Sequence, residues 1–147
     1  MIAKIQSNIT FKAIYLKRND DSVKNIKHIC EIAEASESPF DENESDRIKG
    51  AFRYGLNQLN DGYTNDSETR FLTFKPVYDK TSGLPSGYCL SIVNDDGSEF
   101  AKGCADMPVA GADALRFAFE DLKINYENKL SSLALEQYAK YLEMRKG

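Results

Sequence analysis

Between residues 22 and 145, the spacing of the apolar residues changes from helical to strand-like and back, and this pattern constrains the fold more than any other feature. Residues 22–35, 48–59 and 113–145 carry apolar side chains three or four positions apart, the spacing of an α-helix that buries one face. Residues 70–103 are instead rich in aromatic and β-branched residues, which is typical of strands. Because the strands are clustered and do not alternate with helices, the sequence predicts an α+β fold.

The strand-like runs predict an antiparallel sheet of three to four strands packed against helices. Residues 94–97 read Asn-Asp-Asp-Gly, a strong tight-turn signal between two strand-like runs. The runs 70–75, 87–93 and 98–103 should therefore form a meander. Residues 9–17 alternate well enough to add a further strand, which we expect to be central because both of its faces become apolar.

Helices are expected at residues 22–35 and around the apolar stripe of residues 48–59. Residues 113–145 form one or two further helices, and Asn125 or the pair Ser131–Ser132 favours a bend or break. The expected order is strand, two helices, three strands and one or two helices. A length of 147 residues suits a single domain spanning residues 1–147.

Charge is the feature that stands out most for function. The net charge is -4, yet residues 31–46 alone hold seven carboxylates and no basic residue. An acidic patch of this kind increases the rate of association with a basic protein surface. The alternative is that the charges only keep the protein soluble. We therefore expect a partner-binding surface at Glu31, Glu34, Glu37, Asp41, Glu42, Glu44 and Asp46.

Motifs that carry catalysis or hold a cofactor are missing from the sequence. The three cysteines match no zinc spacing, and we expect them to be reduced. The one histidine, His28, would have to serve any histidine-dependent mechanism by itself. The glycines before residue 113 fit no phosphate-binding pattern. We therefore expect no catalytic residue, no metal and no cofactor.

These observations favour a non-enzymatic binding protein of the accessory, immunity or inhibitor type, with a basic protein as partner. A homodimer through the C-terminal helix is a second expectation, because Tyr126, Tyr138 and Tyr141 join Leu130, Leu133 and Leu142 there. Nucleic acid is disfavoured by the acidic balance. No run approaches the length of a membrane span and no export signal precedes the first strand, so we expect a cytoplasmic location.

An alternative from another class is a small-ligand-binding domain or an enzyme. Its pocket would lie between the sheet and the helices, with polar anchors at His28, Arg53, Arg70 and Tyr88. A deep pocket in which Arg53 or Arg70 meets carboxylates would favour this alternative, and a flat acidic face would favour the binding protein. The sequence leaves the partner and the oligomeric state open.

Overall fold

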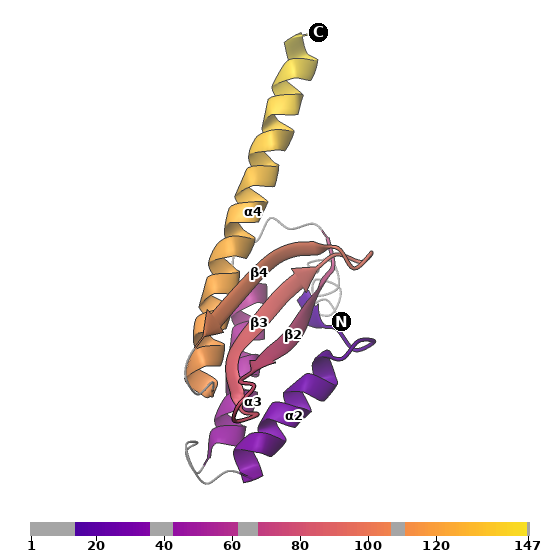
Figure 1. Ribbon diagram of the computed structural model, residues 1–147. Coiled ribbons are helices and arrows are strands. Elements are labelled where there is room, and N and C mark those ends of the chain that lie inside the picture. Colours follow the sequence, from indigo (N-terminus) through magenta and orange to yellow (C-terminus); the bar gives the residue numbers. More distant parts are fainter. Residues whose placement is uncertain (1–13, 36–42, 62–67, 107–110, 147) are drawn as a thin grey trace, which may run out of the picture.

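The computed structural model describes residues 14–35, 43–61, 68–106 and 111–146, which form a four-stranded sheet and three helices (Figure 1). The α+β class and the expected order of elements are confirmed, with a single helix at the C-terminal end. In chain order the elements are β1 (Ile14–Leu16), α2 (Ser22–Ala35), α3 (Glu44–Asn60), β2 (Arg70–Tyr78), β3 (Pro85–Val93), β4 (Glu99–Asp106) and α4 (Ala112–Lys146).

The sheet is mixed, with the strand order β1-β2-β3-β4, so the expectation of a purely antiparallel sheet was wrong. β2, β3 and β4 form the expected antiparallel meander, whereas β1 pairs with β2 in parallel. The connection between β1 and β2 contains both α2 and α3, so it is long enough for the crossover that a parallel pair requires, whereas the tight-turn signal constrains only the meander. β1 also lies at the edge of the sheet and not at its centre, and Tyr15 is 52% exposed there.

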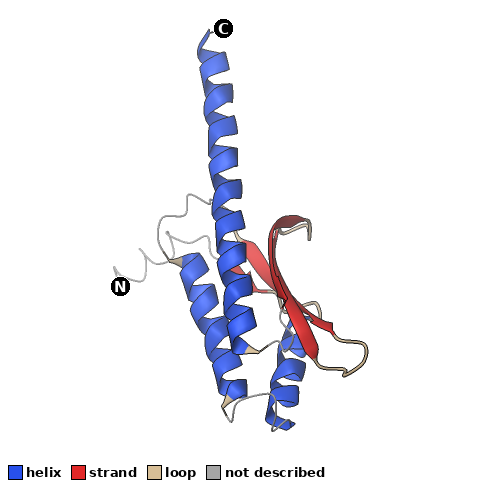
Figure 2. Cartoon of the chain, turned by 60° about the vertical axis from the view of Figure 1, so that its left-hand side comes forward, coloured by secondary structure: helices blue, strands red, loops and turns tan. Residues whose placement is uncertain are grey.

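α4 is one continuous helix, so the preferred bend or break was wrong. The suspected breaker Asn125 donates a hydrogen bond of 2.7 Å from Nδ2 to the carbonyl oxygen of Lys102 in β4. Its side chain therefore anchors the helix to the sheet while its backbone stays helical. At 35 residues, α4 is about 52 Å long, and its C-terminal half extends beyond the sheet (Figures 1 and 2).

The core lies between one face of the sheet and the helices. α3 and α4 cover this face together, as Figure 2 shows from the side. Leu90 and Ile92 of β3 are fully buried against Leu115 and Leu122 of α4. Gly103 lets α4 approach β4 closely, because a Cβ at this position would collide with the backbone of Leu122.

Side chains from the helices cap both edges of the sheet. Beyond the short β1, the backbone N–H of Phe74 donates to Ser22 Oγ at 3.0 Å, and its carbonyl accepts from Asn25 Nδ2 at 2.9 Å. On the other edge, the N–H of Cys104 donates to Asp121 Oδ2 at 3.1 Å, next to the Asn125 contact. Strand groups that would otherwise face solvent are thus satisfied within the chain.

Candidate interaction surface

The C-terminal helix α4 has two apolar faces, of which only one is used by the core. Residues on the inner face recur at helical spacing and are at most 2% exposed; they include Leu115, Ala118, Leu122 and Tyr126. Tyr126 packs edge-on against Phe100 of β4, with ring centroids 5.8 Å apart. This face holds the helix to the body of the protein and is closed to other partners.

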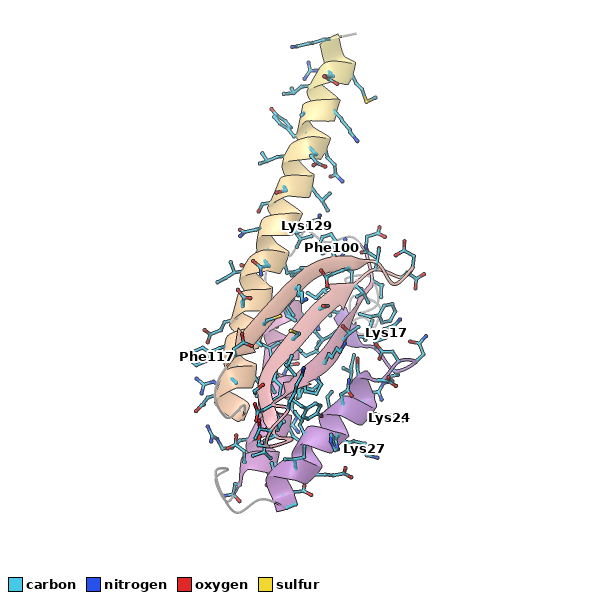
Figure 3. All side chains as sticks on the ribbon, in the orientation of Figure 1. Lys17, Lys24, Lys27, Phe100, Phe117 and Lys129 are labelled. Carbon is cyan, nitrogen blue, oxygen red and sulfur yellow. The ribbon has the colours of Figure 1, made fainter. Side chains whose placement is uncertain are left out.

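The opposite side of α4 carries large apolar side chains that are exposed. At 100° per residue, they fall within a band about 60° wide that lies opposite the inner face. Figure 3 shows Phe117 pointing away from the sheet. We call these residues the outer stripe; their exposed fractions are 54% for Phe117, 57% for Ile124, 70% for Leu135, 59% for Tyr138 and 41% for Leu142.

Spacing along the outer stripe matches that of a coiled coil. Phe117, Ile124 and Tyr138 lie at multiples of seven residues, and Leu135 and Leu142 form the second series of the same heptad. Such a seam runs along a helix that packs side by side with another helix. Packing against the sheet requires only the inner apolar face of α4. A second apolar face that is exposed to solvent therefore indicates a contact surface.

Charges near the outer stripe are balanced. Residues 127–146 contain three acidic and four basic side chains. Tyr138 and Tyr141 stack with ring centroids 6.5 Å apart, and the Arg145 guanidinium lies 5.9 Å from the Tyr141 ring. A nearly neutral surface of this kind does not repel a second copy of itself.

The N-terminal end of α4 is fixed by a buried carboxylate. Glu44 is 5% exposed, and its Oε2 accepts the backbone N–H of Ala112 at 2.5 Å. Its Oε1 accepts from Arg47 Nη1 at 2.9 Å, and Arg47 also reaches Asp113 at 3.1 Å. A carboxylate at this end of a helix satisfies a free N–H group and lies favourably in the helix dipole.

The seven acidic residues expected to bind a partner therefore have different environments. Glu44 is buried and engaged within the fold. Glu31, Glu34 and Asp46 are exposed where α2 ends and α3 begins. Of these, Glu34 accepts a hydrogen bond of 2.8 Å from Ser45 Oγ. The remaining three lie outside the described residues: Glu37, Asp41 and Glu42.

The four anchors expected for a small ligand do not converge. His28 is exposed and meets the Tyr78 ring at 5.8 Å. Arg70 is buried; it bonds to Asn94 and lies 3.7 Å from the centre of the Phe100 ring.

Tyr88 is 1% exposed in the core, and burial raises the pKa of its hydroxyl well above its ordinary value. Arg53 lines an open groove beside Tyr15, Phe52 and Leu56, and the described lining of that groove contains no carboxylate. The four residues therefore build no common site.

A second open groove, of about 250 Å³, runs between α3 and α4. Its walls include Tyr54, Gly55 and Phe119, with Arg116 and Lys123 at the rim. Arg116 is already paired with Asp113 at 3.0 Å, and neither Arg53 nor Arg70 lies in this groove. The groove borders the outer stripe and does not form a separate enclosed site.

Within residues 14–35, 43–61, 68–106 and 111–146, no three metal-ligating side chains of the His, Cys, Asp or Glu type come together. Among the described helices, none combines the length and the apolar character that a membrane crossing requires. The chain matches no protein-family model, no curated protein and no solved structure. The arrangement of its own residues is therefore the basis for a functional assignment.

The outer stripe is the surface that reasoning from the sequence largely missed. The C-terminal helix was expected to self-associate, but three of the residues chosen lie on its inner side: Tyr126 is buried, and Leu130 and Leu133 pack partly against the core. A usable signal existed in the second apolar series that begins at Phe117 and Ile124. It was hidden because residues on both sides of the helix follow helical spacing.

Proposed function

We propose that this protein is a non-enzymatic binding protein that associates with a second copy of itself through the outer stripe of α4. The observation that carries the proposal is the exposed heptad seam on the side of α4 opposite the core. Its occupant is a second α4, because the seam is matched to itself in length, spacing and charge.

Pairing two copies of α4 in antiparallel orientation matches the outer stripe with itself. A two-fold axis near residues 129 and 130 places Phe117 opposite Leu142 of the second copy, and Ile124 opposite Leu135. In an antiparallel coiled coil, the two heptad series face each other in this way. The same axis sets Tyr138 beside the polar Asp121, within reach of its phenolic hydroxyl. A self-complementary patch is what a two-fold dimer requires.

The size of the surface is sufficient for a modest dimer. The five side chains of the outer stripe expose roughly 500 Å² per copy, so two copies would bury about 1,000 Å², the lower limit of specific interfaces. We therefore expect a reversible dimer with a dissociation constant in the micromolar range.

Sedimentation velocity over a range of protein concentrations tests the proposal. Leu135→Glu places a charge into the seam twice per dimer and should weaken association at least about 100-fold. Met144→Glu is the matched control, because Met144 is 79% exposed but lies on the opposite side of α4. A protein that stays monomeric at about 100 µM, or a dimer that Leu135→Glu leaves intact, would refute the proposal.

Disulfide trapping tests the orientation. In a background in which the three native cysteines are serine, Ile124→Cys and Leu135→Cys proteins should cross-link when mixed. A parallel arrangement would instead cross-link each protein to itself, since equal positions then face each other. Self-cross-linking with no mixed product would contradict the antiparallel pairing.

The exposed acidic residues support a second contact surface, for a basic protein. Glu31 and Glu34 belong to the last turns of α2, and Asp46 belongs to the first turn of α3. These two helix ends lie at the end of the protein opposite the projecting end of α4 (Figure 1). Replacing these three with their amides should weaken low-salt binding of polylysine, because exposed carboxylates attract cations. A matched triple amide variant at Asp95, Glu136 and Glu143 is the control, and equal losses in both variants would count against a localised surface.

A further inference from the structure

The face of the sheet that points away from α3 and α4 holds two cysteines in direct contact. Leu90 and Ile92 alternate with Cys89 along β3 and point into the core, so Cys89 lies on the other face. Gly103 likewise faces α4, which places its neighbour Cys104 on the same face as Cys89. Cys89 and Cys104 are register partners in β3 and β4.

Cys89 and Cys104 form a non-hydrogen-bonded pair of the antiparallel ladder. In antiparallel strands, facing residues either exchange both backbone hydrogen bonds or exchange none. The N–H of Cys104 donates to Asp121 Oδ2, on the side away from β3. The pair is therefore of the second kind, in which the Cα atoms are about 4.5 Å apart and the side chains are closest. This separation lies within the range that a disulfide bridges.

The side chains of Cys89 and Cys104 are in contact through their sulfur atoms. The Sγ atoms of Cys89 and Cys104 are 2.6 Å apart, both residues are half-buried, and both are free thiols. Burial and, after it, the hydrogen bond to Cys89 together raise the pKa of the Cys104 thiol to about 11. Cys104 therefore keeps its proton at neutral pH. The third cysteine, Cys30, is 4% exposed in the core cluster with α3 and is not part of the pair.

We propose that Cys89 and Cys104 are a redox-active dithiol that a low-molecular-weight disulfide converts into an intramolecular cross-strand disulfide. Both cysteines are only half-buried, so a small reagent can reach them, and the fold already holds the second sulfur beside the first. Self-association through α4 is not required, because the pair lies on a different surface.

The exchange has two steps. One cysteine, as a thiolate, attacks a sulfur of the small disulfide, forms a mixed disulfide and expels one small thiolate. The other cysteine then releases its proton to solvent and attacks the protein sulfur of the mixed disulfide. The Cys89–Cys104 bond forms and the second small thiolate leaves. Two electrons pass from the protein to the reagent, which ends as two thiols.

The folded protein treated with oxidised glutathione gives the test. Intact mass should fall by two hydrogen atoms, two of the three thiols should resist alkylation after denaturation, and peptide mapping should join residues 89 and 104. Bridging the strands should raise Tm by about 5–10 °C, because the cross-link restricts the unfolded chain. A thiol reductant should reverse each change.

Two variants make the result specific. Cys30→Ser should form the same disulfide, whereas Cys104→Ser should retain glutathione on Cys89 because no second sulfur displaces it. Lasting glutathione adducts on the unsubstituted protein, a bond to Cys30, or a covalent dimer as the main product would overturn the proposal. An oxidised protein with an unchanged or lower Tm would also overturn it, because the sheet would then not hold the pair in a bridgeable geometry.

Discussion

Replacing Glu44 with alanine removes the buried cap of the C-terminal helix. The substitution leaves the backbone N–H of Ala112, itself 2% exposed, without its acceptor at 2.5 Å. It also removes the negative charge from the N-terminal end of a 35-residue helix and one partner of Arg47. Loss of a helix cap costs about 1 kcal/mol, and a buried donor without a partner costs a further 1–3 kcal/mol. We therefore expect Glu44→Ala to reduce the free energy of unfolding by about 2–4 kcal/mol.

Urea denaturation followed by circular dichroism measures this loss. With a slope of about 2 kcal/mol per molar, the midpoint should fall by about 1–2 M. Glu44→Gln keeps an acceptor for the Ala112 N–H but loses the charge, so its cost should be nearer 1 kcal/mol. The exposed Glu31→Ala is the matched control and should change stability by less than about 0.5 kcal/mol. If Glu44→Ala were as stable as this control, the structural role assigned to Glu44 would be wrong.

Three further predictions concern the packing and protonation of the sheet. Gly103→Ala should destabilise the protein by about 1–3 kcal/mol in the same urea assay, because its Cβ meets the Leu122 backbone; an unchanged midpoint would contradict the close approach of α4. Asn125→Ala should cost about 1 kcal/mol, since the β4 carbonyl loses its donor, and an unchanged or higher midpoint would contradict that role. Stability should fall as pH rises from about 9 towards 11: the folded state holds the pKa of Cys104 at about 11 and raises that of Tyr88, so the unfolded chain releases protons first. The double variant Tyr88→Phe, Cys104→Ser should show a weaker dependence of stability on pH. If its stability fell as steeply with pH as that of the unsubstituted protein, the assignment of this dependence to Tyr88 and Cys104 would be wrong.

Local patterns predicted the parts of the fold that depend on neighbouring residues. The helix from Ser22 to Ala35 has the predicted bounds, and Asp20 accepts the backbone N–H of Ser22 at 2.9 Å. The turn signal at residues 94–97 is also confirmed: Asn94 bonds to the Ser98 carbonyl at 2.8 Å, and Gly97 takes a φ of 87°. The helix start and the turn each depend on side chains only a few positions apart, so one sequence is sufficient to predict them.

Features that depend on distant residues could not be predicted. Nothing near Glu44 shows that its carboxylate meets a backbone group 68 residues later. The cysteine contact depends on a bulge: extending the Val93–Glu99 register along both strands would place Gly103 opposite Cys89. A register shift between Ile92 and Val93 moves Cys104 into that position instead. Such a shift follows from how the sheet curves over its helices, which no local pattern records.

The capped edges of the sheet restrict how this protein can polymerise. Ser22 and Asn25 occupy the backbone groups of Phe74 on one side, and Asp121 and Asn125 occupy those of β4 on the other. A strand from another molecule would have to displace these side chains before it could extend the sheet. Growth by strand addition, which leads to fibres, is thereby disfavoured. Contacts through helices remain open, and a two-fold contact closes after one partner has bound.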